Sequence, residues 1–268
     1  MAKTLKVGLA LGSGGPRGFA LIGVIRVLHK NKIPIDFIAG TSAGAIVGGA
    51  YAISRNLSKL ESLVSSFPFK ELIKILLEVN FNGGLVKGEN LRSFAKEQFG
   101  NTKIEKMEVP FCAVAAEAET GKEVIIIKGY LADAIRASSS IPMLFAPFKI
   151  GKKLLIDGGV TQQVPVEIVR NMGADIVIAA NLSEKVLSYN PKNAISSLQH
   201  YVLLLLRALA RENVKTADVV ISPIVSNANW VDNVKQRDQL IKEGERVARR
   251  ALPQIRKLLG ITTRSTKS

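Results

Sequence analysis

The sequence predicts an α/β protein with three layers, in which a mostly parallel central sheet lies between two layers of helices. Strand and helix signals alternate along its 268 residues, and this alternation is typical of parallel strands joined by crossover helices. Hydrophobic residues make up 47% of the chain and charged residues 22%, which is enough apolar material for a substantial core. No repeat, low-complexity linker or change of composition marks a second domain. We therefore expect one domain over residues 1–268.

Short apolar runs bounded by turn residues predict strands at 6–11, 37–39, 110–116, 123–127, 153–156, 175–180 and 219–222. Helical spacing predicts helices at 16–30, 43–54, 131–139, 165–172 and 198–209. Pro16 suits a first helical turn, where its missing N–H costs least. Residues 57–100 are helical in pattern with breaks at Pro68 and at 82–84, and we expect them to form an insertion over the sheet edge or the mouth of a site. A basic helical segment at about 230–260 closes the chain, and Pro253 is expected to kink it or to start a new helix.

The net charge of +15 indicates either an anionic partner or a strongly solvated surface. Residues 230–268 contain ten Lys or Arg against four acids, so part of the excess lies at the C-terminus. Aromatic residues are scarce at 6% and no nucleic-acid motif is present, so we expect no nucleic-acid partner. An anionic membrane surface and plain solubility stay open.

No segment has the features of a secretory signal or a membrane span. The densest apolar stretch, residues 201–206, ends at Arg207, far short of the roughly 18 residues that a spanning helix needs. We expect a cytoplasmic protein, with peripheral contact to the inner membrane surface as an alternative. The single cysteine, Cys112, lies in an apolar run, where we expect an inert buried thiol rather than a nucleophile.

The clearest local signal for chemistry is residues 40–44 (GTSAG), a G-x-S-x-G between a predicted strand and a predicted helix. In a nucleophile elbow this context holds the serine hydroxyl at the C-terminal edge of the sheet, and small flanking residues allow the sharp turn. Ser42 is therefore the candidate nucleophile. The pentapeptide alone also occurs by chance, so the strand and helix around it matter.

A serine nucleophile needs a base, and the chain contains two histidines. His29 lies near the end of a predicted helix, where it could equally cap that helix, and His200 lies in an apolar helix without an acidic neighbour to orient it. Neither follows a strand end, where active sites of α/β proteins collect. The alternative base is Asp157, which ends a predicted strand and precedes two glycines; an ordinary Asp-Gly turn is the competing interpretation.

A glycine loop at residues 12–18 (GSGGPRG) follows the first strand. It could bind a dinucleotide, a phosphate or an oxyanion, since each uses exposed backbone N–H groups. The dinucleotide fingerprint fails because Arg17 stands at its sixth position, and no Gly-Lys-Ser/Thr follows at the spacing of a P-loop. An oxyanion hole needs only a few convergent donors, which Gly14 and Gly15 can supply.

Taken together, residues 12–18, 40–44 and 157–159 resemble the three signatures of the patatin-like phospholipase family, in the family's order. Residues 136–142 (RASSSIP), with Phe145-Ala146-Pro147 after them, are similar to the segment before the aspartate in bacterial-type members. The resemblance covers roughly residues 6–181. It implies a patatin-like form of the three-layer fold and a Ser-Asp dyad that works without a histidine.

The resemblance also implies a role for each matching residue. Ser42 would attack an ester carbonyl and Asp157 would take its proton. Gly14 and Gly15 would hold the oxyanion, with the N–H of Ala43 as a further donor and Arg17 adding positive charge. The remaining motif positions are Gly12, Gly18, Gly40, Gly44, Gly158 and Gly159. Two departures weaken the hole, because Ser13 stands where many members have glycine and Pro16 has no N–H.

The sequence thus predicts a hydrolase that cleaves acyl esters of phospholipids, lysophospholipids or neutral glycerolipids through an acyl-serine, with neither metal nor cofactor. The alternative is a basic peripheral membrane or scaffold protein with this fold and little turnover; nucleotide binding at the glycine loop is a third. The charge and the apolar insertion together suggest a docking hypothesis, in which the basic C-terminal segment and the insertion hold the site against an anionic lipid surface. Its apolar part would be Phe67, Phe69, Leu72, Ile75, Leu76 and Phe81.

Overall fold

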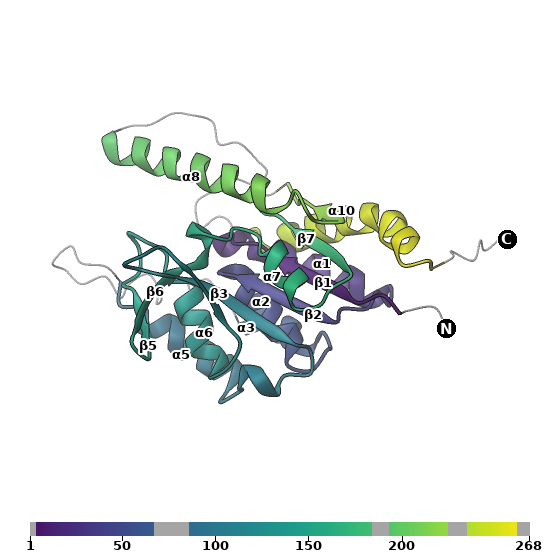
Figure 1. Ribbon diagram of the computed structural model, residues 1–268, viewed down its shortest axis with the longest axis horizontal. Helices are drawn as coiled ribbons and strands as arrows, with labels where there is room; N and C mark the ends of the chain where they lie inside the picture. Colours follow the sequence, from purple (N-terminus) through teal and green to yellow (C-terminus); the bar gives the residue numbers. More distant parts are fainter. Residues whose placement is uncertain (1–3, 67–85, 184–192, 225–234, 262–268) are drawn as a thin grey trace.

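The computed structural model describes residues 4–66, 86–183, 193–224 and 235–261, and Figure 1 shows their arrangement. An eight-stranded sheet lies at the centre, in the order β5-β6-β3-β2-β1-β7-β8, with β4 paired to β3 off this path. The strands are β1 (Val7–Leu11), β2 (Phe37–Thr41), β3 (Phe111–Glu117), β4 (Glu123–Ile126), β5 (Phe148–Ile150), β6 (Lys153–Asp157), β7 (Ile176–Ala180) and β8 (Val219–Ile221).

The sheet is parallel at its centre and antiparallel at one end. Strands β3, β2, β1, β7 and β8 pair in parallel, whereas β4 and β6 run antiparallel to β3, and β5 runs antiparallel to β6. This confirms the predicted mostly parallel sheet. The short strand β5 is the one described strand that the sequence did not predict.

Helices cover the two faces of the sheet unequally. The larger apolar cluster joins one face to α1 (Phe19–Lys30), α2 (Ala43–Ala52), α6 (Leu131–Ser138) and α10 (Arg237–Leu258). The other face packs on the short α7 (Val166–Asn171) and on Ala210, near the end of α8 (Ala194–Asn213). The three-layer prediction is confirmed. Figure 1 shows that most of α8 extends away from the sheet.

Pro253 neither ends α10 nor starts a new helix, because α10 runs unbroken from Arg237 to Leu258. An interior proline costs a helix roughly 3 kcal/mol through the lost hydrogen bond and a steric clash. Packing against α1 offsets this loss, because α10 is buried on both sides of the proline, at Leu252 and Ile255. The two helices approach so closely that a Cβ at Gly244 would lie 1.9 Å from the carbonyl oxygen of Ala20.

The predicted insertion is helical where it is described, as α3 (Ser58–Ser66) and α5 (Glu89–Phe99). Its predicted breaks, and the six apolar residues of the docking hypothesis, lie outside the described residues. Across the described part of the chain, none of the helices has the length and apolarity to cross a bilayer.

Cys112 lies in β3 and is fully buried. Its sulfur lies 3.7 Å from the sulfur of Met172, and burial raises the pKa of the thiol to about 12. A thiol with this pKa stays protonated at neutral pH and is a poor nucleophile. The prediction of an inert buried cysteine is confirmed.

Candidate active site

Ser42 lies in the sharp turn between β2 and α2, at the N-cap of the helix. Its backbone has φ 54° and ψ −116°, a conformation that non-glycine residues rarely adopt and that is costly unless its surroundings impose it. Two buried hydrogen bonds hold the turn. The Ser42 N–H donates to Ser138 Oγ at 2.9 Å, and the Ser138 hydroxyl donates to the carbonyl of Val114 at 2.6 Å. The predicted strand-turn-helix context of the serine is therefore observed.

The glycines on either side of Ser42 allow this turn to fit against the sheet. A Cβ at Gly44 would lie 2.1 Å from the carbonyl oxygen of Leu11, and a Cβ at Gly40 would lie 2.4 Å from the carbonyl oxygen of Gly44. Both distances are far below van der Waals contact with rigid backbone. Any larger residue would push α2 away from β1, so the G-x-S-x-G spacing is a packing requirement here.

Asp157 reaches Ser42 because β2 and β6 pair with the same edge of β3, end to end. Thr41, the last residue of β2, pairs with Val114, and Asp157, the last residue of β6, pairs with the next residue, Ala115. Strand β4 occupies the opposite edge of β3 at both positions. The ends of β2 and β6 therefore meet, and they bring the serine and the aspartate together from positions 115 residues apart in the sequence.

The carboxyl of Asp157 is buried, and its two oxygens differ in their surroundings. Oδ1 accepts a hydrogen bond from the N–H of Gly159 at 2.7 Å, whereas Oδ2 has no partner at hydrogen-bond distance among the described residues. Burial raises the pKa of this carboxyl to about 6, and interactions with the Ser42 hydroxyl and the Gly159 N–H limit the rise. A carboxyl with a pKa near 6 is a good proton acceptor that is still ionised at neutral pH.

The chain on both sides of Asp157 is held firmly. A Cβ at Gly158 would lie 2.3 Å from the carbonyl oxygen of Val114, so only glycine fits there. The Asp157 N–H donates to the carbonyl of Ser140 at 2.9 Å. Arg136, which is buried, donates to Ser140 Oγ at 2.6 Å and to the carbonyl of Ala146 at 2.9 Å. Residues 136–147 thus support the aspartate, although the sequence marked them only by resemblance.

The glycine loop after β1 contains two backbone N–H groups without an acceptor among the described residues, and Gly15 lines the pocket whereas Gly14 does not. The N–H groups of Gly12 and Ser13 are occupied, by the carbonyls of Ala180 and Gln163. Those of Gly14 and Gly15 have no acceptor within the described part of the chain. Gly15 and Gly18 line the pocket beside Ser42, and Gly18 lies so close to Ala43 that a Cβ there would be 2.6 Å from that of Ala43.

The guanidinium of Arg17 stabilises this loop through hydrogen bonds. Its Nε donates to the carbonyl of Gly14 at 3.1 Å and an η nitrogen donates to the carbonyl of Leu182 at 3.4 Å. Burial lowers the pKa of the guanidinium. Arg17 is not among the residues that line the pocket, so its position favours shaping the loop over direct contact with a reacting group.

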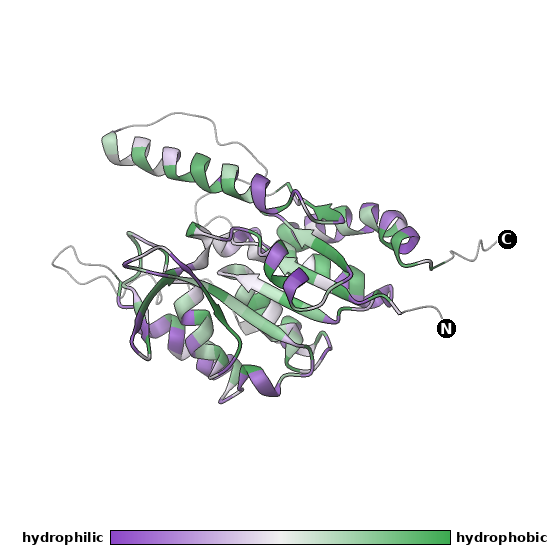
Figure 2. Cartoon of the chain, viewed as in Figure 1, coloured by the Kyte–Doolittle hydropathy of each residue, from purple (hydrophilic) through white to green (hydrophobic). Residues whose placement is uncertain are grey.

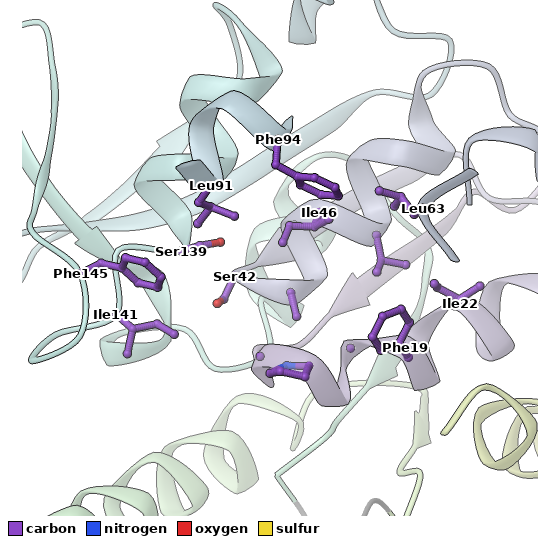
Figure 3. Close-up of a pocket in the computed structure, with 15 residues that line it drawn as sticks. Phe19, Ile22, Ser42, Ile46, Leu63, Leu91, Phe94, Ser139, Ile141 and Phe145 are labelled. Carbon is purple, nitrogen blue, oxygen red and sulfur yellow. The ribbon is translucent and has the colours of Figure 1, made fainter. Parts of the chain in front are cut away.

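Ser42 opens into an almost wholly apolar pocket, shown in Figure 3. Its walls come from η1 (Gly15–Gly18), α1, α2, α3, α5 and the residues after α6. The labelled apolar side chains around it are Phe19, Ile22, Ile46, Leu63, Leu91, Phe94, Ile141 and Phe145. Leu63, Leu91 and Phe94, which line this pocket, belong to the described part of the predicted insertion.

Ser139 is the one pocket residue with a hydroxyl besides Ser42, and the sequence did not single it out. It is buried, and its hydroxyl has no hydrogen-bond partner among the described residues. Figure 3 shows Ser42 and Ser139 in the same pocket, with Leu91 above them in this view. Nothing in its sequence context distinguishes Ser139 from Ser138 and Ser140, because only the end of α6 decides which of the three faces the pocket.

Neither histidine lies in the pocket. His29 is in the last turn of α1, where Nδ1 lies 3.0 Å from the hydroxyl of Tyr51, and His200 lies on the projecting α8. Among the residues that the structure describes, no three His, Cys, Asp or Glu side chains are grouped to hold a metal ion. The site offers a serine, a carboxylate and backbone donors, which together suit nucleophilic attack on an ester.

Comparison with known proteins places the chain in a family. The family model described as "Patatin-like phospholipase" matches residues 9–170. An uncharacterised NTE family protein of Mycobacterium tuberculosis is 36% identical over 178 residues, which are 66% of this chain and 49% of that protein. Lysophospholipase NTE1 of Yarrowia lipolytica is 30% identical over 179 residues, 66% of this chain and 12% of its own length. The chain thus spans half, or much less, of the relatives it matches.

Among solved structures, VipD from Legionella pneumophila superposes with a TM-score of 0.58. The superposition covers 94% of this chain and 67% of VipD, at 13% sequence identity. At this identity the likeness concerns the fold alone. It agrees with the three-layer architecture described above.

Proposed function

Because this chain belongs to the patatin-like phospholipase family, we propose that it hydrolyses acyl esters of lipids, with Ser42 as nucleophile and Asp157 as base. One observation carries the proposal: β2 and β6 end against neighbouring residues of β3, so the elbow serine meets a buried carboxyl with one unpartnered oxygen. Hydrolytic chemistry with two side chains requires this juxtaposition.

The proposed reaction runs in two steps through an acyl-enzyme. Ser42 Oγ attacks the ester carbonyl while its proton passes to Asp157; the alkoxy group then leaves with that proton, and the acyl group stays on Ser42. In the second step Asp157 takes a proton from water, whose oxygen attacks the acyl carbon. The fatty acid leaves, and the proton returns to Ser42. Asp157 is therefore the base in both attacks and the acid in both departures.

Negative charge that develops on the carbonyl oxygen needs donors already in place. We assign this role to the N–H groups of Gly14 and Gly15, which have no acceptor among the described residues. The N–H of Ala43, at the first position of α2, is a third donor, and such orphan N–H groups at a helix start favour an anion. Pro16 contributes none, so the hole depends on these three.

The pocket indicates the part of the substrate that lies beside Ser42. Its walls are apolar except for the two serines, so burying a fatty acyl chain there is favourable and burying a charged head group is not. We therefore place the acyl chain among Phe19, Ile46 and Phe94. Phospholipids, lysophospholipids and neutral glycerolipids all meet this requirement.

Release of free fatty acid from defined lipids tests the function. We expect the purified protein to release fatty acid from lysophosphatidylcholine, phosphatidylcholine or monoacylglycerol. Ser42→Ala serves as the blank, since it removes the proposed nucleophile and leaves the pocket intact. If all three lipids stay intact with the wild-type protein, and a soluble short-chain ester does too, the chain is a binding protein with this fold.

The rate should depend on pH through Asp157. The pKa of this carboxyl is raised to about 6 by burial, and only the ionised form accepts the serine proton. We therefore expect kcat/KM for a soluble ester to fall about tenfold per pH unit below pH 6 and to level off above it. A profile without a break near pH 6, or one that falls as pH rises through 6, would contradict the assignment of Asp157 as base.

A further inference from the structure

Helix α8 exposes an unusually large number of apolar side chains. Of its described side chains only Ala210 is buried. Its exposed large apolar residues are Leu198, Tyr201, Val202, Leu203, Leu204 and Leu205. Figure 2 shows this apolar stretch on a helix that stands clear of the body of the protein. A water-soluble surface rarely presents so large an apolar patch without a function.

The residues of α8 are arranged as in an interfacial helix. Leu198, Tyr201, Val202 and Leu205 follow the i, i+3, i+4, i+7 spacing that places them on one stripe. Arg207 and Arg211 fall on the opposite side of the helix at 100° per residue, where the exposed Leu203 and Leu204 flank them. The helix carries no acid before Glu212. The exposed apolar surface of α8 is therefore wider than one stripe, and its cations lie toward the C-terminal end of the helix. Exposed apolar residues next to Arg and without acids suit a helix that lies at an anionic lipid surface.

Charge decides which partner fits this surface. Arg207 and Arg211 form no ion pair with any described residue. Arg211 is exposed, so its charge is available to an anionic partner, whereas Arg207 is half-buried and its Nε is buried. The chain as a whole carries +15, which opposes pairing with a second copy and favours an anionic bilayer. The basic segment at the C-terminus offers no apolar surface of this kind, because the apolar stripe of α10 is buried against α1, at Leu240, Ile241, Ala248 and Ile255. The apolar part of the docking hypothesis lies outside the described residues.

The C-terminal end of α8 lies next to the active site. Asn213, its last residue, accepts a hydrogen bond through Oδ1 from the N–H of Val164 at 3.3 Å. The neighbouring Gln163 accepts from the N–H of Ser13 in the glycine loop at 2.8 Å and donates to the carbonyl of Gly159 at 3.0 Å. A lipid surface that holds α8 would therefore lie close to the proposed nucleophile.

We propose that α8 docks the protein on anionic membranes, with Leu198, Val202 and Leu205 inserted among the lipids and Arg207 and Arg211 near the phosphates. The inference rests on the proposed function in so far as the docked bilayer would supply the substrate. The occupant is an anionic bilayer, and not a second copy of the chain.

Vesicle co-sedimentation tests the proposal with a matched pair of double variants. Leu198→Glu/Leu205→Glu alters two α8 side chains that are 51% and 70% exposed; Ile125→Glu/Ile127→Glu alters two on and beside β4 that are 44% and 59% exposed, with the same change of charge. Each is made in a Ser42→Ala background, so that binding is measured without turnover. The vesicles are phosphatidylcholine alone, or phosphatidylcholine and phosphatidylglycerol in equal parts.

We expect the Ser42→Ala parent and the β4 variant to bind the mixed vesicles, and the α8 variant to bind them at least about tenfold more weakly. Neutral vesicles should bind all three weakly. If both double variants lose vesicle binding equally, the change of charge alone accounts for the loss. If the Ser42→Ala parent does not bind the mixed vesicles, the protein does not dock on anionic membranes. Either result overturns the proposal. The proposal is also overturned if the parent sediments as a dimer and the α8 variant as a monomer, and neither binds vesicles.

A fluorescence measurement locates the contact directly. Tyr201→Trp and, as its control, Tyr130→Trp are each made with the single native Trp230 replaced by phenylalanine. Vesicles with brominated acyl chains should quench the tryptophan at position 201 and leave that at position 130 unquenched. The reverse order, or equal quenching, overturns the assignment to α8.

Failure of this proposal is distinguishable from failure of the proposed function. With Ser42 present, the α8 double variant should hydrolyse a water-soluble short-chain ester at the wild-type rate and lose activity on vesicles. If the wild-type protein hydrolyses the soluble ester but does not bind vesicles, the proposed function is kept and the docking proposal is rejected. Vesicle binding without hydrolysis of any ester does the opposite.

Discussion

Replacement of Ser42 by alanine should abolish ester hydrolysis, lowering kcat by about 10⁴-fold or more. The same change should abolish labelling by a fluorophosphonate, which reacts with activated serine hydroxyls. The reason is structural. The hydroxyl is held in a strained turn by the Ser138 hydrogen bond, next to a buried carboxyl, and no other serine in the described residues has both features.

Ser54→Ala is the matched control, because the Ser54 hydroxyl is buried and has no hydrogen-bond partner among the described residues, yet it lies outside the pocket. We expect this variant to keep its label and its activity. Mass spectrometry of the labelled peptide should place the adduct on Ser42. An adduct that persists on Ser42→Ala protein would assign the nucleophile to another residue.

Replacement of Asp157 by asparagine should lower kcat/KM by about 10²- to 10⁴-fold while the protein stays folded. Asparagine keeps an oxygen that can accept from the Gly159 N–H, so the turn after β6 is preserved. It cannot accept the proton of Ser42. His29→Ala and His200→Ala should each keep most of the activity, since neither histidine lines the pocket. A histidine variant as inactive as Asp157→Asn would restore a triad.

The same substitution should stabilise the protein at neutral pH. The folded-state pKa of Asp157 is about 6, above its ordinary value of 3.8, so the folded protein binds this proton more tightly than the unfolded chain does. Its contribution to stability is present below pH 4 and is lost as pH rises through 6. Removing the ionisable group should therefore raise the free energy of unfolding at pH 8 by about 3 kcal/mol. Urea unfolding at pH 8 measures it, and a less stable variant would contradict the pKa.

The effect of pH on this comparison is a further check. At pH 4 the carboxyl of wild-type Asp157 is mostly protonated in the folded state, so it resembles the neutral amide. The difference in stability between the wild type and Asp157→Asn should therefore shrink as pH falls from 8 to 4. If the difference in the free energy of unfolding stays constant from pH 8 to pH 4, the greater stability of Asp157→Asn comes from packing and not from removal of the buried charge.

Much of the fold and the site could be predicted from the sequence, because those parts depend on neighbours in the chain. Apolar runs of strand length gave seven of the eight strands. The glycines around Ser42 indicated an elbow, since only residues without a side chain allow such close contact with β1. An apolar setting was enough to predict that Cys112 is inert.

Tertiary structure decided the features that depend on distant partners. The meeting of Ser42 with Asp157 follows from two strands that share one edge of β3, and strand order is not encoded in any local pattern. Helix α10 continues past Pro253 because it packs on α1, although proline disfavours the interior of a helix. The apolar run 201–206 could as well have been a buried helix, because periodicity does not tell whether another element covers it. Only the tertiary structure shows that Leu198 and residues 201–205 of α8 are exposed, and that the end of α8 lies beside the loop that follows the proposed base.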